Sequence, residues 1–268
     1  MSRLTVSRSG HSYAIDGNRV PSVTTIIGNA SDKPGMVVSA AKLTAEWAAT
    51  HHDLLDALGE AAWLKQASGH YRDEWRAKAD KGTDVHALAR AALRGEPVDV
   101  PDALADLVRH AVDFMDTWKV REIAAEAACY SPQWRYAGRF DLLAEMADGH
   151  TWLLDWKTGK GPYVNQALQL VGYATTDFYQ DDDGDDVEMP TPDKLGFVML
   201  GDDGWELVPV TRWNEPEHEG DRQRLIAVFR SMIPVSNFVE WATPDYRTGI
   251  AKWAVLGEAV PAPKAAAS

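Results

Sequence analysis

RYAGRFDLLAEMADGHTWLLDWK, residues 135–157, is the stretch that decides the core of this chain. The residues on both sides of Asp148-Gly149 have the apolar, strand-like character of β-structure. Asp-Gly is itself a residue pair typical of a two-residue hairpin turn. The segment therefore predicts an antiparallel hairpin, and pairing across its turn would bring Asp141 of the first strand close to Asp155 of the second.

Asp155 and Lys157 lie two positions apart near the end of the second strand. Side chains of a strand alternate between its faces, so these two charges are expected on the same face. A charged pair on an otherwise buried strand costs free energy unless it has a partner or a chemical role. A catalytic pair and a structural ion pair both satisfy this condition.

Two neighbouring carboxylates repel each other, and one of them stays protonated unless a cation lies between them. Oxygen ligands of this kind suit Mg²⁺ or Mn²⁺. A pairing of Asp141 with Asp155 therefore predicts a metal site. The alternative for Asp141 is an exposed aspartate at the end of a strand.

Other elements follow from periodicity and from turn residues. We expect an N-terminal hairpin around Asp16-Gly17, helices over residues 37–95 broken at Gly59, Gly69 and Gly82, a helix over 103–118 capped by Asp102, strands over 122–130, 135–146 and 151–156, a helix over 165–179, strands over 195–200 and 205–210, and a helix over 217–232. This order predicts a mixed α/β core with a helical N-terminal elaboration. The expected division is residues 1–79 for the elaboration, 80–242 for the core and 243–268 for a C-terminal segment with a frayed tail.

Composition is that of an ordinary folded protein, with 268 residues, 45% hydrophobic and 25% charged. No run reaches the roughly 18 consecutive apolar residues of a membrane span, and the first residues lack the core of a signal peptide. Cys129 is the only cysteine, which excludes an intramolecular disulfide and an iron–sulfur cluster held by several thiolates. We expect a soluble protein of a reducing compartment, the cytoplasm.

The net charge of −13 comes from 27 basic and 40 acidic side chains, and six of the acidic ones fall within residues 181–188. Such a block is typical of a solvated loop, and the alternative is a regulatory or mimicry role. Net charge limits non-specific adhesion rather than what a focused cleft binds. Nucleic acid therefore remains open as a partner.

Four motifs together resemble the RecB-type branch of the PD-(D/E)XK nucleases. They are Lys81-Gly-Thr-Asp-Val-His86, Gly138 with Asp141, Asp155-Trp156-Lys157, and Gln169 with Tyr173, in the order that the family has them. The opening residues 11–28 further resemble phage-encoded members. The single cysteine matches the members that lack an iron–sulfur cluster, and the chain has no phosphate-loop motif of a helicase.

The resemblance implies a restriction-endonuclease-like core sheet flanked by helices and one Mg²⁺ or Mn²⁺ ion. His86, Asp141 and Asp155 would hold this ion together with the Trp156 carbonyl. Lys157 would orient or deprotonate the attacking water. Other implied roles are an outer metal ligand for Glu126 and contacts with DNA for Gln169, Tyr173 and Lys160, although a solvated lysine is an equal alternative at position 160.

The expected function is a metal-dependent DNA exonuclease for phage recombination or DNA end processing, with a recombination or single-strand-annealing protein as a potential partner. One alternative is a structure-selective endonuclease on the same core. Another is a catalytically silent DNA-binding or interaction module. The intact charges of Asp141, Asp155 and Lys157 argue against a silent module, because buried charges would not be expected to persist at a site that has lost its activity.

Overall fold

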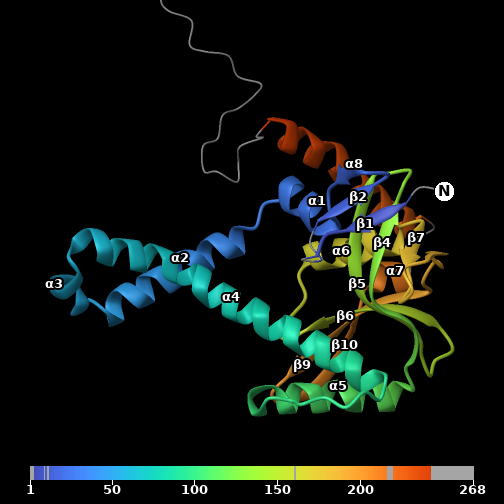
Figure 1. Ribbon diagram of the computed structural model, residues 1–268, viewed down its shortest axis with the longest axis horizontal. Helices are drawn as coiled ribbons and strands as arrows, with labels where there is room; N and C mark the ends of the chain where they lie inside the picture. The colour runs from blue at the N-terminus through green and yellow to red at the C-terminus, as the bar shows by residue number, and fades with distance from the viewer. Residues whose placement is uncertain (1–2, 9, 11, 160, 216–219, 243–268) are drawn as a thin grey trace, which may run out of the picture.

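The computed structural model describes residues 3–8, 10, 12–159, 161–215 and 220–242. This part of the chain forms a seven-stranded sheet, a smaller three-stranded sheet and helices on both sides of the larger one (Figure 1). The predicted mixed α/β class is confirmed. Among these residues, no helix combines the length and the apolar character that crossing a bilayer requires.

The seven-stranded sheet has the strand order β10-β9-β6-β5-β4-β7-β8. Its strands are β4 (Arg121–Ser131), β5 (Tyr136–Glu145), β6 (Thr151–Lys157), β7 (Phe178–Gln180), β8 (Asp186–Glu188), β9 (Lys194–Gly201) and β10 (Gly204–Pro209). β6 pairs parallel with β9, and the other neighbours pair antiparallel. The hairpin of β5 and β6 turns at Gly149, which has φ 76°, so the central prediction from the sequence is confirmed.

Helices cover both faces of this sheet. On one face lie α1 (Val23–Ala30), α6 (Val164–Ala174) and α8 (Asp221–Ala242), and on the other lie α5 (Ala105–Trp118) and the end of α4 (Glu60–Leu93). Each face has its own hydrophobic cluster. Trp156 of β6, for example, packs edge-on against Phe114 of α5 with ring centroids 5.7 Å apart. This packing holds β6 against α5.

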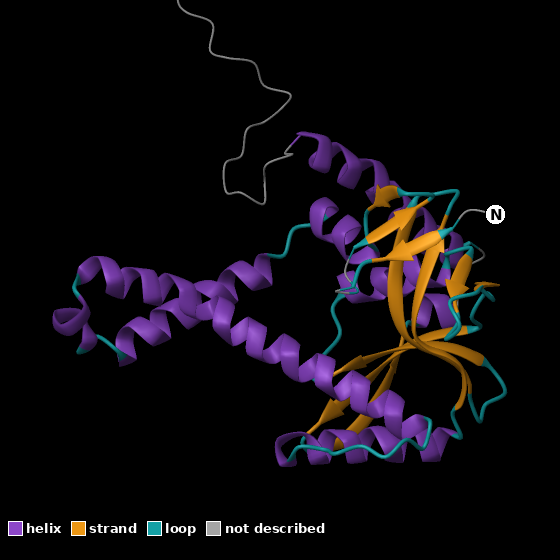
Figure 2. Ribbon diagram, viewed as in Figure 1, coloured by secondary structure: helices purple, strands orange, loops and turns teal. Residues whose placement is uncertain are grey.

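A helical arm extends away from the sheet (Figure 2). It consists of α2 (Pro34–Thr50), α3 (Leu54–Leu58) and the first part of α4. α4 runs for 34 residues without interruption, about 51 Å at 1.5 Å per residue. The breaks expected at Gly69 and Gly82 are therefore wrong, and only Gly59 separates two helices. A glycine inside a helix costs about 1 kcal/mol, which tertiary packing outweighs.

The N-terminal hairpin is confirmed within a three-stranded sheet of β1 (Leu4–Val6), β2 (Tyr13–Ile15) and β3 (Asn18–Val20). Its turn residues Asp16 and Gly17 have φ 52° and 75°. Ile15 packs on the far ends of β4 and β5, against Tyr130 and Ala137. The expected boundary at residues 79 and 80 falls inside α4, and the division into 1–79, 80–242 and 243–268 stays a prediction.

Four further expectations differ from the structure. Asp102 does not cap α5, because it begins a short 3₁₀ helix, η1 (Asp102–Leu104), and α5 starts after Leu104 without a side-chain cap. The helix expected over 165–179 ends at Ala174, and its last residues form β7. The acidic loop contains β8, and β7 and β8 pair as a hairpin. The helix expected over 217–232 is α8, which begins at Asp221 and continues to Ala242, and a short α7 (Thr211–Asn214) precedes it. Residues 216–219 and 243–268 lie outside the described residues.

Candidate metal centre

Helix α4 crosses the sheet so that His86 lies over the middle strands. Its Nδ1 atom is 3.3 Å from Asp141 Oδ2 and 3.7 Å from Glu126 Oε1. One ligand atom from each of these three side chains lies within 4.8 Å of the others. His86, Glu126 and Asp141 thus form a candidate metal-binding triad, which we call the triad.

Three carboxylates form a row across adjacent strands beneath the histidine. The register of β4 and β5 is the same on both sides of Glu126, which places that residue opposite Asp141. The register of β5 and β6, extended one position beyond Leu142 and Leu154, places Asp141 opposite Asp155. The row therefore runs from β4 through β5 to β6, and the expected approach of Asp141 and Asp155 follows from it.

Glu126 has a backbone conformation that is unusual within a strand. Its φ is 51°, in the left-handed region, and the Arg139 guanidinium donates a hydrogen bond to its carbonyl. Ala124 and Ala127 both pack in the cluster beneath α1 and α6, so the alternation of β4 shifts by one position here. Such backbone conformations cost about 1–3 kcal/mol and concentrate at functional sites. The fold therefore holds Glu126 in the triad at an energetic cost.

The donor set of the triad fits a divalent cation. It offers one imidazole nitrogen and two carboxylates, which ligate Mg²⁺, Mn²⁺ and related ions in proteins. Glu126 Oε1 is buried and has no hydrogen-bond partner among the described residues. Buried polar atoms are normally paired, so this oxygen is one that a bound cation would satisfy.

His86 holds a proton in the absence of a metal. Burial would lower the pKa of its imidazole, but Asp141 and Glu126 outweigh burial and raise this pKa to about 10. The protonated ring can donate from Nε2 to the Trp156 carbonyl, 3.0 Å away, and from Nδ1 toward Asp141. A metal ion would take the place of the Nδ1 proton. The Trp156 carbonyl would then fix the ring through Nε2–H, as partners of metal-bound histidines do.

Asp155 and Lys157 lie beside the triad and form an ion pair. Asp155 is only 3% exposed, and burial together with Asp141 raises its pKa to about 7 against the opposing effect of Lys157. The pKa of Asp141 shifts the other way. Burial would raise it, but the opposing effects of His86, Lys157 and the Trp156 N–H are larger, so the pKa of Asp141 is lowered. The Trp156 N–H donates to Asp141 Oδ2 at 2.8 Å. Asp141 is therefore the charged member of the pair, and Asp155 the one that can exchange a proton near neutral pH.

Gln169 and Tyr173 lie one helical turn apart on α6 and share one face of it. Gln169 Nε2 donates to Tyr173 Oη at 2.8 Å. The Tyr173 ring is buried against Gly138, where a Cβ atom would overlap the ring. Burial raises the pKa of Tyr173 well above its ordinary value. The glycine of the Gly138–Asp141 motif is thus explained by packing.

The structure groups Glu126, rather than Asp155, with His86 and Asp141. The Trp156 carbonyl contacts the imidazole of His86. Lys160 lies outside the described residues.

Sequence reasoning did not identify three arginines near the site: Arg90, Arg94 and Arg139. The first two follow His86 at intervals of four residues on α4, a spacing that places side chains on one helix face.

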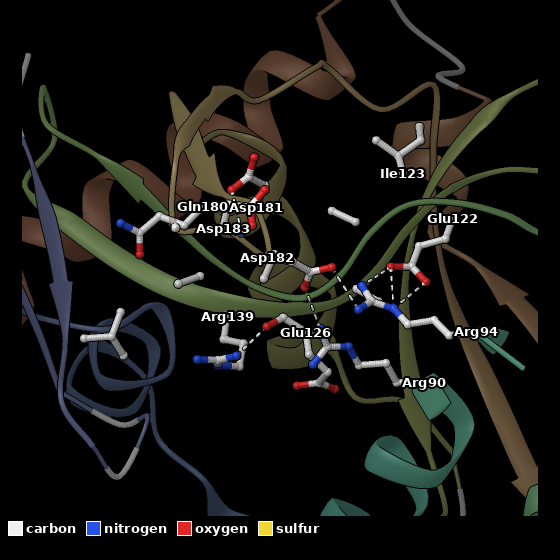
Figure 3. Close-up of a pocket in the computed structure, with 16 residues that line it drawn as sticks. Arg90, Arg94, Glu122, Ile123, Glu126, Arg139, Gln180, Asp181, Asp182 and Asp183 are labelled. Carbon is white, nitrogen blue, oxygen red and sulfur yellow. Dashed lines mark hydrogen bonds and ion pairs between the residues drawn. The ribbon is translucent and has the colours of Figure 1, made fainter. Parts of the chain in front are cut away.

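A cleft of about 430 Å³ opens beside the triad, between β4, the end of α4 and the β7–β8 turn (Figure 3). Its lining includes Glu126 and the charged side chains of Arg90, Arg94, Glu122, Arg139 and Asp182. Arginine is the residue best suited to bind phosphate or carboxylate groups through paired hydrogen bonds. Three guanidinium groups therefore lie next to the candidate metal centre, although the carboxylates that line the same cleft, which also include Asp181 and Asp183, outnumber them.

The chain matches no family model and no curated protein. Among solved structures, the crystal structure of SSO0001 is similar over 58% of this chain and 70% of that chain, with 14% sequence identity and a TM-score of 0.27. A likeness at this TM-score carries no argument about the fold. Function is therefore inferred from the geometry of the site.

Proposed function

We propose that this protein is a metal-dependent DNA exonuclease with a restriction-endonuclease-like core. The observation that carries the proposal is the row of Glu126, Asp141 and Asp155 across three strands, with His86 over it and Lys157 paired to its last member. Hydrolysis of a phosphodiester needs charge neutralisation at the phosphoryl group and an activated water. The row supplies anionic ligands for a cation, and this cation would neutralise charge at the phosphoryl group. The Asp155–Lys157 pair supplies the groups that would activate the water.

Nδ1 of His86 and the carboxylates of Glu126 and Asp141 would hold the ion, for which Mg²⁺ or Mn²⁺ fits best. When bound, the ion supplies Lewis-acid polarisation of the phosphoryl oxygens and lowers the pKa of a bound water. Asp141 contributes a fixed negative charge, because the neighbouring cations keep its pKa low. His86 is kept in the orientation that points Nδ1 at the carboxylates by its contact with the Trp156 carbonyl.

Lys157 is the group that would act on the attacking water. Its side chain is 21% exposed while its ammonium contacts the nearly buried Asp155. An ammonium in this position can orient the water and offset charge on the phosphate. In the metal-free protein, burial and Asp141 raise the pKa of Asp155 to about 7, which is in the range suited to general acid–base catalysis at neutral pH.

Two features favour an active enzyme over a silent binding module. Asp155 is buried at a cost in desolvation, and Glu126 adopts a left-handed backbone with a buried carboxylate oxygen that has no hydrogen-bond partner within the described structure. Each feature lowers stability unless the site has a use. Roles in phage recombination or DNA end processing would follow from exonuclease activity and stay predictions.

The direct test is an incubation of the full chain with Mg²⁺ or Mn²⁺ and three DNA substrates: an end-labelled linear duplex, a single strand and a covalently closed circle. We expect the linear DNA to be shortened from its ends and the circle to remain intact. Asp141→Asn, which keeps the shape of the side chain but removes its charge, is expected to abolish cleavage.

Cleavage that persists in EDTA or in the Asp141→Asn protein would contradict the proposed chemistry. Cutting of the closed circle would replace the exonuclease with an endonuclease on the same site. Absence of cleavage with either metal on all three substrates would remove the nuclease proposal.

A further inference from the structure

The turn between β7 and β8 reaches across the cleft to helix α4. Asp182 at this turn contacts two arginines with its two carboxylate oxygens (Figure 3). Oδ1 is 2.7 Å from Arg90 Nη2, and Oδ2 is 2.8 Å from Arg94 Nη1. One carboxylate thus bridges two guanidinium groups, and we call these two residues the arginine pair.

The arginine pair continues the line that starts at the candidate metal centre. Arg90 and Arg94 follow His86 by four and eight residues on α4, which corresponds to about 6 and 12 Å along the helix axis. The same cleft that they line also includes Glu126 of the triad. A ligand that passes the metal centre along this cleft would therefore meet both guanidinium groups.

The arrangement around Asp182 is the one expected for an oxyanion. Two guanidinium groups bind two oxygens of one anion, which a phosphodiester offers as well as a carboxylate does. Glu122 also binds the Arg94 side chain, because Arg94 Nε donates to Glu122 Oε1 at 3.1 Å. Withdrawal of Asp182 would leave the two arginines and Glu122 with one net positive charge.

Asp182 is held in place by a contact that a ligand can displace. Its side chain is 61% exposed, and exposed ion pairs contribute little because water solvates both partners. The turn itself is ordered by Asp181, whose Oδ1 accepts the N–H groups of Asp183 at 3.1 Å and Asp185 at 2.9 Å. The turn therefore presents its negative charge toward the cleft in a defined geometry, and it would repel DNA while it stays there.

We propose that Arg90 and Arg94 bind a backbone phosphate of DNA next to the metal centre, and that Asp182 occupies their site in the free protein. The acidic turn is then an internal competitor that the substrate must displace. This inference rests on the proposed function for the identity of the ligand. The competition between Asp182 and a phosphate anion is measurable without any cleavage.

The test compares Asp182→Asn with Asp183→Asn. Both variants remove one negative charge from the same turn, but Asp183 makes no ion pair with any described residue, so the difference between them isolates the contact with the arginine pair. Binding of a short fluorescent duplex is measured by anisotropy in Ca²⁺, to suppress hydrolysis. We expect Asp182→Asn to tighten the dissociation constant about three- to tenfold relative to wild type, the range that two exposed ion pairs allow. Asp183→Asn should change it less than twofold.

A second arm uses inorganic pyrophosphate in EDTA, which removes the metal centre as a binding site. We expect pyrophosphate to bind Asp182→Asn more tightly than wild type or Asp183→Asn in calorimetry. Adding Arg90→Gln to Asp182→Asn should cancel the gain for both DNA and pyrophosphate. Circular dichroism verifies that each variant is folded.

Equal binding by Asp182→Asn and Asp183→Asn in either arm would overturn the inference, whatever the cleavage assay shows. A gain that survives Arg90→Gln would also overturn it. If the wild type cleaves no DNA but both gains are present and depend on Arg90, the nuclease proposal is removed, while the phosphate site and its competitor remain.

Discussion

Metal binding at the triad should release a proton from His86. The pKa of this imidazole is raised to about 10 in the metal-free protein, so the ring is almost fully protonated at neutral pH. A metal ligand must be deprotonated before it binds. The perturbation to apply is therefore pH, with His86→Asn as the variant that keeps a polar side chain but cannot bind a proton.

The pKa sets the expected magnitude. At pH 7.5 the removal of this proton costs about 3.4 kcal/mol, since each pH unit below the pKa corresponds to 1.36 kcal/mol. The association constant for Mn²⁺ should consequently rise about tenfold between pH 7.5 and pH 8.5. Asp155, with a pKa of about 7, is already mostly ionised over this interval and should add little.

Isothermal titration calorimetry of the metal-free protein under argon measures both quantities. Titrations in two buffers with different ionisation enthalpies give the number of protons released, which should be close to one for the wild type and close to zero for His86→Asn. A pH-independent affinity in the wild type, or equal proton release in the variant, would refute the assignment of His86 as a ligand that exchanges a proton for metal.

Three other outcomes follow from the same contacts. Without metal, the pKa of His86 is higher in the folded protein, about 10, than in the unfolded chain, about 6.5. The resulting stabilisation is complete below pH 6.5 and is lost as the pH rises toward 10. The melting temperature should therefore fall over that range in the wild type, and fall less in His86→Asn. Lys157→Ala should keep metal affinity and slow cleavage about 10²–10⁴-fold in single-turnover assays. Lys157→Arg should not rescue the rate, because the planar guanidinium group of arginine differs in shape from an ammonium and stays protonated. Gly138→Ala should lower the free energy of unfolding in urea by about 1–3 kcal/mol, because its methyl group overlaps the Tyr173 ring. Gly82→Ala should be neutral or stabilising, because a Cβ at this position inside α4 would make only an ordinary contact with Thr158 Oγ1, 3.9 Å away.

Turn chemistry was predictable because it is local. Asp16-Gly17 and Asp148-Gly149 were expected to turn, and the residues at 16, 17 and 149 have positive φ in the structure. A left-handed backbone is a requirement of the turn itself, and only a few residue types meet it at low cost. The hairpins that follow from these turns were therefore predictable from short segments.

Helix boundaries were less predictable. Gly69 and Gly82 suggested breaks, but α4 passes through both because its packing on α2 and on the sheet exceeds a penalty of about 1 kcal/mol per glycine. Asp102 is a residue type that commonly caps helices, yet it lies in a 3₁₀ turn before α5. Local propensity competes with tertiary contacts in both cases, and the contacts decide the outcome.

The part of the site that one hairpin builds was predictable from the sequence. Asp141, Asp155 and Lys157 come together through a single turn and the period of two along a strand, both of which are properties of a short segment. The other contacts of the site depend on how distant elements pack together. His86 meets the Trp156 carbonyl across 70 residues, and Arg90 meets Asp182 across 92, because the packing of α4 on the sheet sets which turn of the helix faces which strand. Such contacts depend on the summed burial of two hydrophobic clusters, which no local pattern of residues encodes.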